Sequence, residues 1–491
     1  MAALDLTTRQ LTPQQRVAAA TSLRNVFIEA EPGSGKTTVA AQRFGVLRYA
    51  TGADERAVAA VSFTRSATSE LRARVKRSWG PSALAWPHRI STIDFLMRRL
   101  VTALMAGGHI SWPGGHVELD VIDDWRSITE STWHRTETRV GLVQRQVVVS
   151  WGQAVKRKPR PTVAAVQGHV GDGICTHDDI RSVLADALED PELAQLVRER
   201  LRSSVRALIV DEVFDANELD LAIVELAMDA GLEVTIIGDP WQALYAFRGA
   251  KPHLVPELVR RTQMSHLPLT ASFRWETDEQ RQLAARLRQK VGVVLPTATA
   301  SEVDVVLASQ WKYLWAIDEV LPLAFAPGAN EEGKAAETLL LDLVARSALQ
   351  MNAAAIGESL KALGITDGDL SDVEPALGDV IEALRAPQLD ATQVAFGLLR
   401  DALQLVMGRP LGQPVHDDLL RLRDLRARLL ASTVVPGLTT HQAKGREWAT
   451  VGVRLDAKEA RDLQAGLVPT LEPNRKTYVA CTRARRHTFS V

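Results

Sequence analysis

The chain has 491 residues, of which 46% are apolar and 24% are charged, a composition that predicts a protein folded throughout and excludes long low-complexity tracts. This length predicts about three domains. The formal net charge is -1, so any nucleic-acid surface must come from local clusters of Lys and Arg. Two cysteines exclude a disulfide framework and a four-cysteine zinc site. No apolar leader or membrane-length apolar run is present, so we expect a cytoplasmic protein.

The first motif is LTPQQ at residues 11–15, where Thr12 and Pro13 suit the N-cap and first turn of a short helix. The Gln15 amide can donate and accept hydrogen bonds at once, as an adenine edge requires. The alternative is that Gln15 is an ordinary surface residue.

Residues 30–38 read AEPGSGKTT and join an apolar run at 26–28 to a helical pattern. This is the Walker A pattern with Ala30 in place of its first glycine. Glycines let the loop curl so that backbone N–H groups face an anion, while the lysine adds a charge and the following threonine a magnesium ligand. The predicted phosphate cradle contains Gly33, Ser34, Gly35, Lys36, Thr37 and Thr38.

A second apolar run at 57–63 leads into a helix rich in basic residues. Thr64 and Arg65 would lie at the strand tip, where phosphates could bind, and Phe63 could stack on a base. A solvated basic helix face is the alternative. The segment 90–100 repeats this order, and its Thr92 could donate to a phosphate.

Between residues 101 and 201 the pattern breaks into short pieces and predicts an insertion. Its basic run KRKPRP at 156–161 is expected to be a solvated loop, with contact to a nucleic-acid backbone as the alternative. Regular structure resumes where Thr176 or Asp178 can cap a helix.

An apolar run at 207–210 ends in the carboxylates of Asp211 and Glu212. Carboxylates at the end of a buried strand are costly unless a cation or donor meets them. Asp211 is therefore the candidate magnesium ligand, and Glu212 the candidate base for an attacking water. A pair of loop-capping residues is the alternative.

The next apolar run, at 234–237, is followed by Gln242, whose amide could sense a terminal phosphate. Tyr245, Phe247 and Arg248 then form a possible stacking platform for single-stranded bases. Core packing of the two rings is the alternative. One further strand at 267–269 would place Phe273 and Arg274 at its tip.

Alternating strands and helices predict α/β units in which helices cover both faces of a parallel sheet. The segments after residue 269 and after residue 436 are expected to build a second such unit together, with mostly helical structure between them at 310–430. In the helix that begins near Asp417, four leucines should face inward and four arginines outward. These are Leu419, Leu422, Leu425 and Leu429, and Arg421, Arg423, Arg426 and Arg428.

In this order, the segments resemble the motifs of the UvrD/Rep-like branch of superfamily 1 helicases. LTPQQ resembles the Q motif, and AEPGSGKT, VSFTRSA, STIDF, DEVFDAN, GDPWQALYAFRGA and SFRW resemble motifs I, Ia, Ib, II, III and IV. LTTHQAKGREW at 438–448 and YVACTRARR at 478–486 resemble motifs V and VI. Phe214, Asp94 and Arg446 depart from the usual Gln, His and Leu of motifs II, Ib and V.

The resemblance implies two RecA-like P-loop motor domains, each with a compact inserted subdomain. The first domain would comprise residues 1–100 and 202–271 around an insert at 101–201. The second would comprise 272–310 and 433–491 around a helical insert at 311–432.

The resemblance also implies a role for each matching residue. Gln15 and Phe273 would contact adenine, and Glu447 would lie near the ribose. Lys36, Glu212, Gln242, Arg274 and Arg483 would be the catalytic set, the two arginines acting as fingers from the second motor domain. Single-stranded DNA would run over Phe63, Thr64, Arg65, Thr92, Tyr245, Phe247, Arg248 and His441.

The expected function is an ATP- and Mg²⁺-dependent DNA helicase or translocase that moves 3′ to 5′, by family resemblance, on single-stranded DNA or on duplex with a single-stranded overhang. The alternative is a DNA- or nucleotide-sensing subunit of a larger nuclease-containing complex for repair or anti-phage defence. The sequence carries no nuclease segment after motif VI, which leaves room for a separate nuclease or repair/defence partner, by analogy with Gabija-type systems.

Overall fold

The computed structural model describes residues 11–50, 54–327 and 330–491. The described chain forms two units, which meet in the sequence between Phe273 and Arg274. Residues 1–10, on which part of the expectation about a leader rests, lie outside this description. Within the described residues, no helix combines the length and apolar character needed to cross a bilayer.

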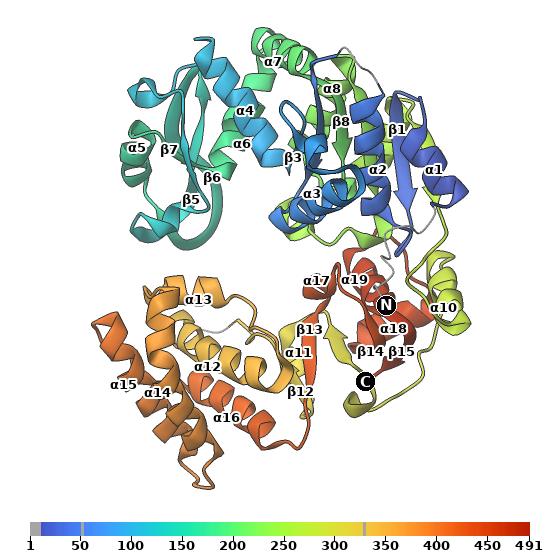
Figure 1. Cartoon of the computed structure of the whole chain (residues 1–491). Helices are drawn as coiled ribbons and strands as arrows, with labels where there is room; N and C mark the ends of the chain where they lie inside the picture. Colours follow the sequence, from blue (N-terminus) through green and yellow to red (C-terminus); the bar gives the residue numbers. More distant parts are fainter. Residues whose placement is uncertain (1–10, 51–53, 328–329) are drawn as a thin grey trace. The chain divides into compact units, whose positions relative to one another are not determined.

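The first unit is built on a six-stranded parallel sheet with the order β10-β1-β9-β8-β2-β3 (Figure 1). Neighbouring strands in space are distant in sequence, as in a doubly wound fold. The strands are β1 (Asn25–Ala30), β2 (Ala57–Ser62), β3 (Arg89–Thr92), β8 (Val205–Val210), β9 (Glu233–Gly238) and β10 (Ser265–Leu269).

Helices cover both faces of this sheet, each over its own apolar cluster. Alternate residues of a strand serve the two clusters: Val26 and Ile28 pack on one side, Phe27 on the other. The first face carries α1 (Pro13–Ala20), α2 (Lys36–Tyr49) and α3 (Arg65–Trp79). The second carries α4 (Ile93–Ala106), α7 (Pro191–Ser204), α8 (Glu218–Asp229) and α9 (Leu254–Arg261).

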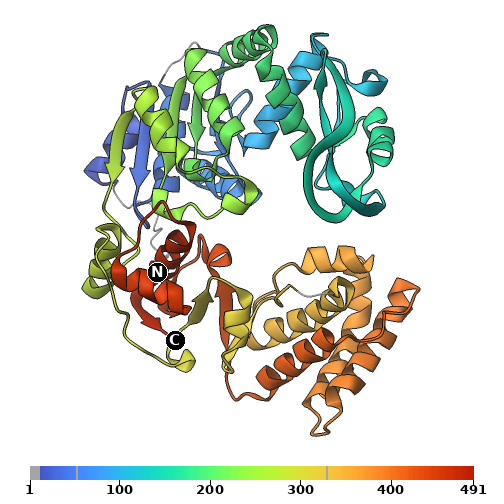
Figure 2. The same ribbon diagram turned by 180° about the vertical axis from the view of Figure 1, so that it is seen from behind.

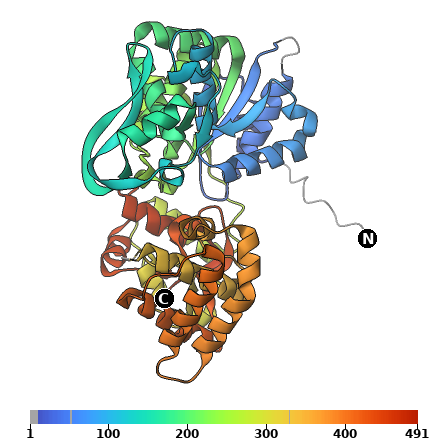
Figure 3. The same cartoon turned by 90° about the vertical axis from the view of Figure 1, so that its left-hand side faces the viewer.

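A long antiparallel ribbon dominates the region between α4 and α7 (Figure 3). It consists of β5 (Ser131–Val143) and β6 (Gln146–Pro161), beside α5 (Val163–Gly171), α6 (His177–Glu189) and a short parallel pair, β4 (Asp120–Ile122) and β7 (Ile174–Thr176). The expectation of a loop at 156–161 was therefore wrong. Proline cannot donate to a ladder, but a two-stranded ribbon has free edges where Pro159 and Pro161 are tolerated.

The second unit contains a five-stranded parallel sheet with the order β12-β13-β11-β14-β15. Its strands are β11 (Val305–Ala308), β12 (Val320–Pro322), β13 (Val435–Thr439), β14 (Trp448–Arg454) and β15 (Ala484–Ser490). Its helices are α10 (Asp278–Arg288), α11 (Trp311–Trp315), α17 (Thr440–Ala443), α18 (Ala457–Ala465) and α19 (Glu472–Cys481). The predicted fold class, α/β with two RecA-like sheets, is confirmed.

Five further helices form the insert of the second unit, the orange group in Figure 2. They are α12 (Glu331–Leu349), α13 (Ile356–Leu363), α14 (Asp367–Arg385), α15 (Ala391–Met407) and α16 (His416–Leu430). Of the predicted inward face of α16, Leu422 and Leu425 are fully buried.

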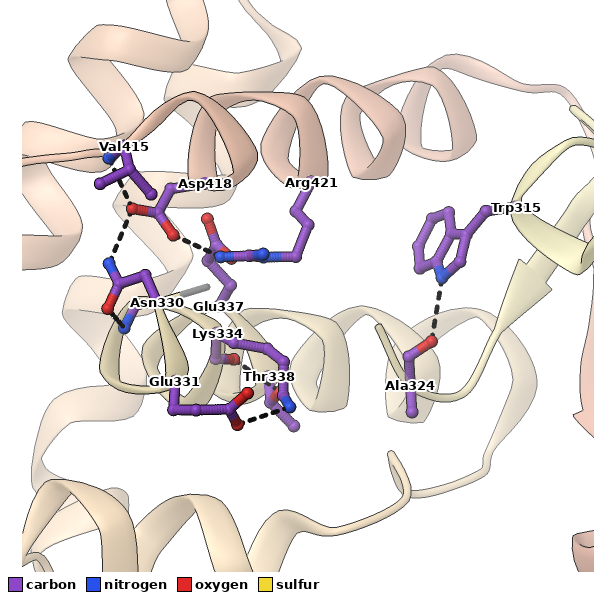
Figure 4. A network of polar contacts seen from close by, with 11 residues as sticks. Trp315, Ala324, Asn330, Glu331, Lys334, Glu337, Thr338, Val415, Asp418 and Arg421 are labelled. Carbon is purple, nitrogen blue, oxygen red and sulfur yellow. Dashed lines mark hydrogen bonds and ion pairs between the residues drawn. The ribbon is translucent and has the colours of Figure 1, made fainter. Parts of the chain in front are cut away.

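The prediction that the arginines of α16 stay outside was wrong for Arg421 and Arg428, which are both buried. Arg421 donates to the carboxylates of Glu337 and Asp418, which are themselves buried (Figure 4). Arg428 donates to backbone carbonyls of the α11–β12 segment. A buried cation is tolerated when such partners satisfy it. Glu337 and the α11–β12 carbonyls come from other elements, whereas Asp418 belongs to α16 itself.

We expect Arg421→Met to lower the free energy of unfolding by about 3 to 5 kcal/mol, because it leaves the buried carboxylates of Glu337 and Asp418 without their cation. The control is Arg423→Met, since the Arg423 side chain is 67% exposed. Urea titrations of both variants measure the difference. Equal stability of the two variants would contradict the structural role of Arg421.

The network of Arg421, Glu337 and Asp418 also predicts that the free energy of unfolding depends on pH. Burial raises the pKa of Glu337 well above its usual 4.5. The native state therefore binds more protons than the unfolded state above about pH 4.5, and stability falls as the pH rises from there toward the native pKa. Glu337→Gln should remove this fall in the free energy of unfolding with rising pH.

Candidate functional site

Most of the singled-out segments of the first unit follow the carboxyl ends of strands in one parallel sheet. β1 leads to the loop before Lys36, β9 to Gln242 and β8 to Asp211. β9 pairs with both β1 and β8, so these three strands are adjacent. Because parallel strands end at the same edge, the fold brings the three motifs together, at the edge where α/β sheets bind ligands.

The loop between β1 and α2 has the backbone of a phosphate cradle. Gly33 and Gly35 have φ values of 74° and 82°, which only glycine adopts without strain. The Ser34 side chain is 1% exposed, and its Oγ has no hydrogen-bond partner among the described residues. Ala30 is fully buried at the end of β1. A buried hydroxyl without a partner and a nearby lysine fit a bound phosphate.

Lys36 and the two carboxylates form the charged centre of the site. Lys36 Nζ lies 3.1 Å from Glu212 Oε1. Asp211 is 3% exposed, and burial together with the charge of Glu212 raises its pKa to about 7, which Lys36 partly offsets. The Glu212 side chain makes no capping bond to the turn η5 (Val213–Asp215), whereas Asp211 Oδ1 accepts from Glu212 N–H at 3.0 Å, so the loop-capping alternative holds in part for Asp211. The carboxylates of Asp211 and Glu212 and the hydroxyl of Thr37, the second residue of α2, are oxygen ligands of the kind that Mg²⁺ takes.

Gln242 is fixed at the end of β9 by Asp239. Its Nε2 donates to Asp239 Oδ2 at 2.7 Å, and Asp239 Oδ1 accepts from Trp241 N–H at 3.1 Å. Both Asp239 and Gln242 are buried. Asp239 thus fixes the Gln242 amide, which follows β9 at the same sheet edge as the loop before Lys36.

Gln15 and Phe273 both contact the loop that precedes α2. Gln15 is 4% exposed, so the surface alternative was wrong; its Nε2 donates to Ser34 O at 2.8 Å, and its Oε1 accepts from Thr12 N–H at 3.0 Å. Phe273 N–H donates to Gly33 O at 2.9 Å, and its side chain is 45% exposed. Both residues therefore border the cradle.

Two contacts to this loop were missed in the sequence. Arg74 of α3 donates to Thr38 Oγ1 at 2.9 Å and is held by Glu70. Ser272 Oγ donates to Pro32 O at 2.7 Å. The only sequence signal for Arg74 was its spacing of four from Glu70, which is common on any exposed helix.

The candidate nucleic-acid residues at the ends of β2 and β3 are partly engaged in local structure. Thr64 Oγ1 caps α3 by accepting from Ala67 N–H at 3.1 Å, and Thr92 Oγ1 caps α4 by accepting from Phe95 N–H at 3.3 Å. Phe63 is half-buried against the core. Arg65 is 79% exposed at its side chain and lies 3.1 Å from Asp123.

Tyr245, Phe247 and Arg248 form one aromatic and cationic group beyond the end of β9. The two rings are 5.9 Å apart, and the Arg248 guanidinium lies 5.2 Å from the Tyr245 centroid and 5.6 Å from that of Phe247. Phe247 is 65% exposed, so the core alternative was wrong for this ring, whereas Tyr245 is half-buried.

Phe214 and Asp94, which depart from the motif pattern, have clear packing roles. Phe214 is buried against Phe27, and a Cβ on Gly238 would lie 2.8 Å from its ring, so β9 must end in glycine there. Asp94 pairs at 2.6 Å with Arg181 of α6, which also pairs at 2.9 Å with Asp220 of α8. One arginine thus links the inserted region to two helices of the sheet.

In the second unit, the structure brings Arg274, Glu447 and Arg483 together. Arg274 Nε donates to Glu447 Oε1 at 2.7 Å, and its Nη1 donates to Thr482 O at 2.9 Å. Arg483 is 1% exposed, and its Nε donates to Val479 O at 3.1 Å. His441 is a half-buried residue of α17, and Arg446 is exposed.

The chain is similar to several known proteins. The family described as an AAA domain matches residues 14–248. The chain is 28% identical over 263 residues to ATP-dependent DNA helicase Rep of Salmonella typhimurium, a match that covers 50% of this chain and 38% of that protein. It is 27% identical over 263 residues to DNA helicase II of Escherichia coli, with 49% and 35% covered.

A shorter match, 32% identical over 116 residues, is to the RecBCD enzyme subunit RecB of Mycolicibacterium smegmatis and covers 24% of this chain and 10% of that protein. The chain thus spans well under two thirds of the length of these relatives.

Proposed function

We propose that this chain, which belongs to the UvrD/Rep-like family of superfamily 1 helicases, hydrolyses ATP and uses the energy to move along single-stranded DNA. The observation that carries the proposal is the group of Lys36, Asp211, Glu212 and Gln242 at the ends of three adjacent strands. It lies within the matched residues 14–248. Movement from 3′ to 5′ is proposed from the family resemblance alone.

In this proposal the loop amides, Ser34 and Lys36 bind the phosphates of ATP, and Phe273 and Gln15 border the adenine. Thr37 and Asp211 would hold Mg²⁺, which neutralises charge that develops on the phosphates. When Lys36 turns to a phosphate, its 3.1 Å pair with Glu212 is lost. Glu212 then accepts a proton from the attacking water, and Gln242 contacts the terminal phosphate.

The second unit supplies the remaining catalytic charges in this proposal. Arg274 and Arg483 stabilise the transferring phosphoryl group, which requires guanidinium groups held in place. Glu447 fixes Arg274 through a 2.7 Å bond and would lie near the ribose. DNA would contact His441 as well as the first-unit residues Phe63, Thr64, Arg65, Thr92, Tyr245, Phe247 and Arg248.

Phe214 and Asp94 favour a second candidate function. The polar residues usual at these motif positions are replaced here by a buried ring and by a carboxylate tied to Arg181. In this second reading the chain is a DNA- or nucleotide-sensing subunit of a nuclease-containing repair or anti-phage defence complex.

Steady-state ATP hydrolysis with and without single-stranded DNA separates the motor from the sensing subunit. A motor should hydrolyse ATP faster when single-stranded DNA is added. A sensing subunit should bind ATP without DNA-stimulated turnover. Absence of hydrolysis under both conditions, with Mg²⁺ present, would overturn the proposed motor.

Phe247→Ala should weaken single-strand binding by roughly 1 to 3 kcal/mol, with little dependence on base sequence, because a stacking face is lost. Stability should change by less than about 1 kcal/mol, since the ring is 65% exposed. Fluorescence anisotropy and a thermal melt give the two quantities.

Tyr49→Ala is the matched control. Tyr49 also contacts a second ring, Trp79 at 5.7 Å, and an arginine, Arg48 at 5.2 Å, but it lies at the far end of α2 from the cradle. The stacking assignment would be refuted if both variants bound DNA equally well.

A further inference from the structure

One turn at the end of α19 connects the two arginines that are the candidate fingers. Arg483 is the second residue after α19, which ends at Cys481, and its Nε donates back to Val479 O at 3.1 Å. The carbonyl between them, Thr482 O, accepts from Arg274 Nη1 at 2.9 Å. A shift of this turn would therefore displace both guanidinium groups at once.

Side chains from α10 and β15, two other elements of the second unit, hold this turn (Figure 1). The last carbonyls of a helix lack an N–H from a following turn, so they need other donors. Cys481 O accepts from Gln280 Nε2 of α10 at 2.8 Å and from Thr488 Oγ1 of β15 at 2.9 Å. Both donors are buried, so bulk water could not replace a bond that a substitution removes.

The neighbours of the Gln280 amide determine its orientation. A carbonyl can only accept, so the nitrogen of Gln280 faces Cys481 O, and its oxygen then lies 3.0 Å from Thr488 Oγ1. The single hydroxyl proton of Thr488 serves either Gln280 Oε1 or Cys481 O at one time. Gln280 Nε2 is therefore the donor on which the Cys481 carbonyl depends, and Thr488 orients the amide that supplies it.

Gln280 also belongs to the segment that carries Arg274, since it lies in the first turn of α10. This segment is bonded to β15 at the surface, where Glu276 N–H donates to Arg485 O at 2.8 Å and Thr277 Oγ1 donates to Arg486 O at 2.6 Å. Gln280 adds a buried bond to the turn itself. The amide thus joins the segment of one candidate finger to the turn that precedes the other.

We propose that Gln280 is a positioning residue for ATP hydrolysis. Its amide holds the turn 481–483, and thereby keeps Arg274 and Arg483 in the relative geometry that stabilises the transferring phosphoryl group. This inference rests on the proposed function, because it takes these two arginines to be the fingers. Gln280 itself does not touch the nucleotide. The expected effect is large, because a misplacement of about 1 Å in a reacting geometry can cost roughly 10²-fold in rate.

The test is Gln280→Met in the full chain. Met is unbranched and fills nearly the same buried space, but it cannot donate to Cys481 O. The kcat for ATP should fall by about 10- to 100-fold while KM changes by less than about threefold, because the fingers act on the transition state more than on bound ATP.

A second readout separates positioning from loss of stability. The probe is ADP with aluminium fluoride, which resembles the transferring phosphoryl group, and analogues of a transition state report the contacts made there. Gln280→Met should bind this probe about 10- to 100-fold more weakly than the parent, in proportion to its loss of kcat, and should bind ADP alone as the parent does. Lower stability alone would leave the ratio of the two affinities unchanged.

Asn474→Leu is the matched control. Asn474 is also a buried amide of α19, but it lies at the other end of the helix, where its Nδ2 donates to Asp462 Oδ2 at 3.0 Å and its Oδ1 accepts from Val468 N–H at 3.0 Å. This variant should lower the melting temperature, as Gln280→Met does, but keep the parent kcat per folded molecule. A thermal melt of each variant gives the folded fraction at the assay temperature.

Thr488→Val is the second variant, and it decides the question if Gln280→Met does not fold. It keeps the Gln280 side chain and removes the hydroxyl that orients its amide, so it should lower kcat in the same direction by a smaller factor. Parent kcat in folded Thr488→Val would then overturn the positioning role.

The positioning role and the proposed function fail in different ways. Parent kcat and parent affinity for ADP with aluminium fluoride in Gln280→Met would overturn the positioning role and leave the motor standing. An equal loss of kcat per folded molecule in Asn474→Leu would overturn it too. If the parent chain itself does not hydrolyse ATP, the proposed function fails, and the positioning role fails with it.

Discussion

Glu212→Gln should lower the turnover number for ATP by roughly 10² to 10⁴, the usual contribution of a general base, while ATP still binds. Gln has nearly the shape of Glu, so the position beside Lys36 stays filled, but an amide cannot take a proton from water. The 3.1 Å contact to Lys36 and the position at the end of β8 place Glu212 at the same sheet edge as the phosphate cradle. Lys36→Ala should abolish hydrolysis by removing the charge that meets the phosphates.

Glu218→Gln is the matched control for this result. Glu218 also pairs with a lysine, Lys251, at 2.7 Å, but its side chain is 67% exposed at the start of α8. Steady-state rates and the affinity for a fluorescent ATP analogue separate turnover from binding. Turnover like that of the parent in Glu212→Gln would refute the assignment of the base.

Arg274→Ala and Arg483→Ala should each lower the rate of hydrolysis by about 10³ to 10⁵, with a modest loss of ATP affinity, if these residues stabilise the transferring phosphoryl group. Both guanidinium groups are held by hydrogen bonds through Nε, to Glu447 and to Val479 O respectively. Arg274→Lys should also be impaired, because an ammonium cannot reproduce the planar fork.

Arg485→Ala provides the control, since Arg485 is two residues from Arg483 and pairs with Glu276 on the surface of the same unit. Rates are compared at saturating ATP, and a thermal melt of each variant separates catalytic loss from unfolding. A near-parent rate in either finger variant would remove that residue from the catalytic set.

The elements around the candidate site were largely predictable from sequence. Apolar runs marked β1, β2, β8 and β9, and the polar residues that follow them had to meet at one edge once the sheet was parallel. Gly33 and Gly35 predicted the loop between β1 and α2, because few other residues adopt its positive φ values. Thr12 and Pro13 predicted the start of α1, because threonine is favoured at the N-cap and proline in the first turn.

Features that depend on distant partners were not predictable. Arg421 looks like a surface residue on a helical wheel, and its burial is tolerable because Glu337 on another helix pairs with it together with Asp418. The role of Arg74 depends on where α3 lies against Thr38. At 156–161, charges and prolines suggested a loop, whereas pairing with β5 fixes a strand. In each case a contact between separate segments decides the structure.

The most direct test of the proposed motor is ATP-dependent displacement of streptavidin from single-stranded DNA that carries biotin at one end. The proposal predicts faster displacement from the 5′ end, since movement is 3′ to 5′, and no displacement by Lys36→Ala. ATP hydrolysis that single-stranded DNA fails to stimulate, together with displacement that does not depend on ATP, would contradict a motor and favour a sensing subunit.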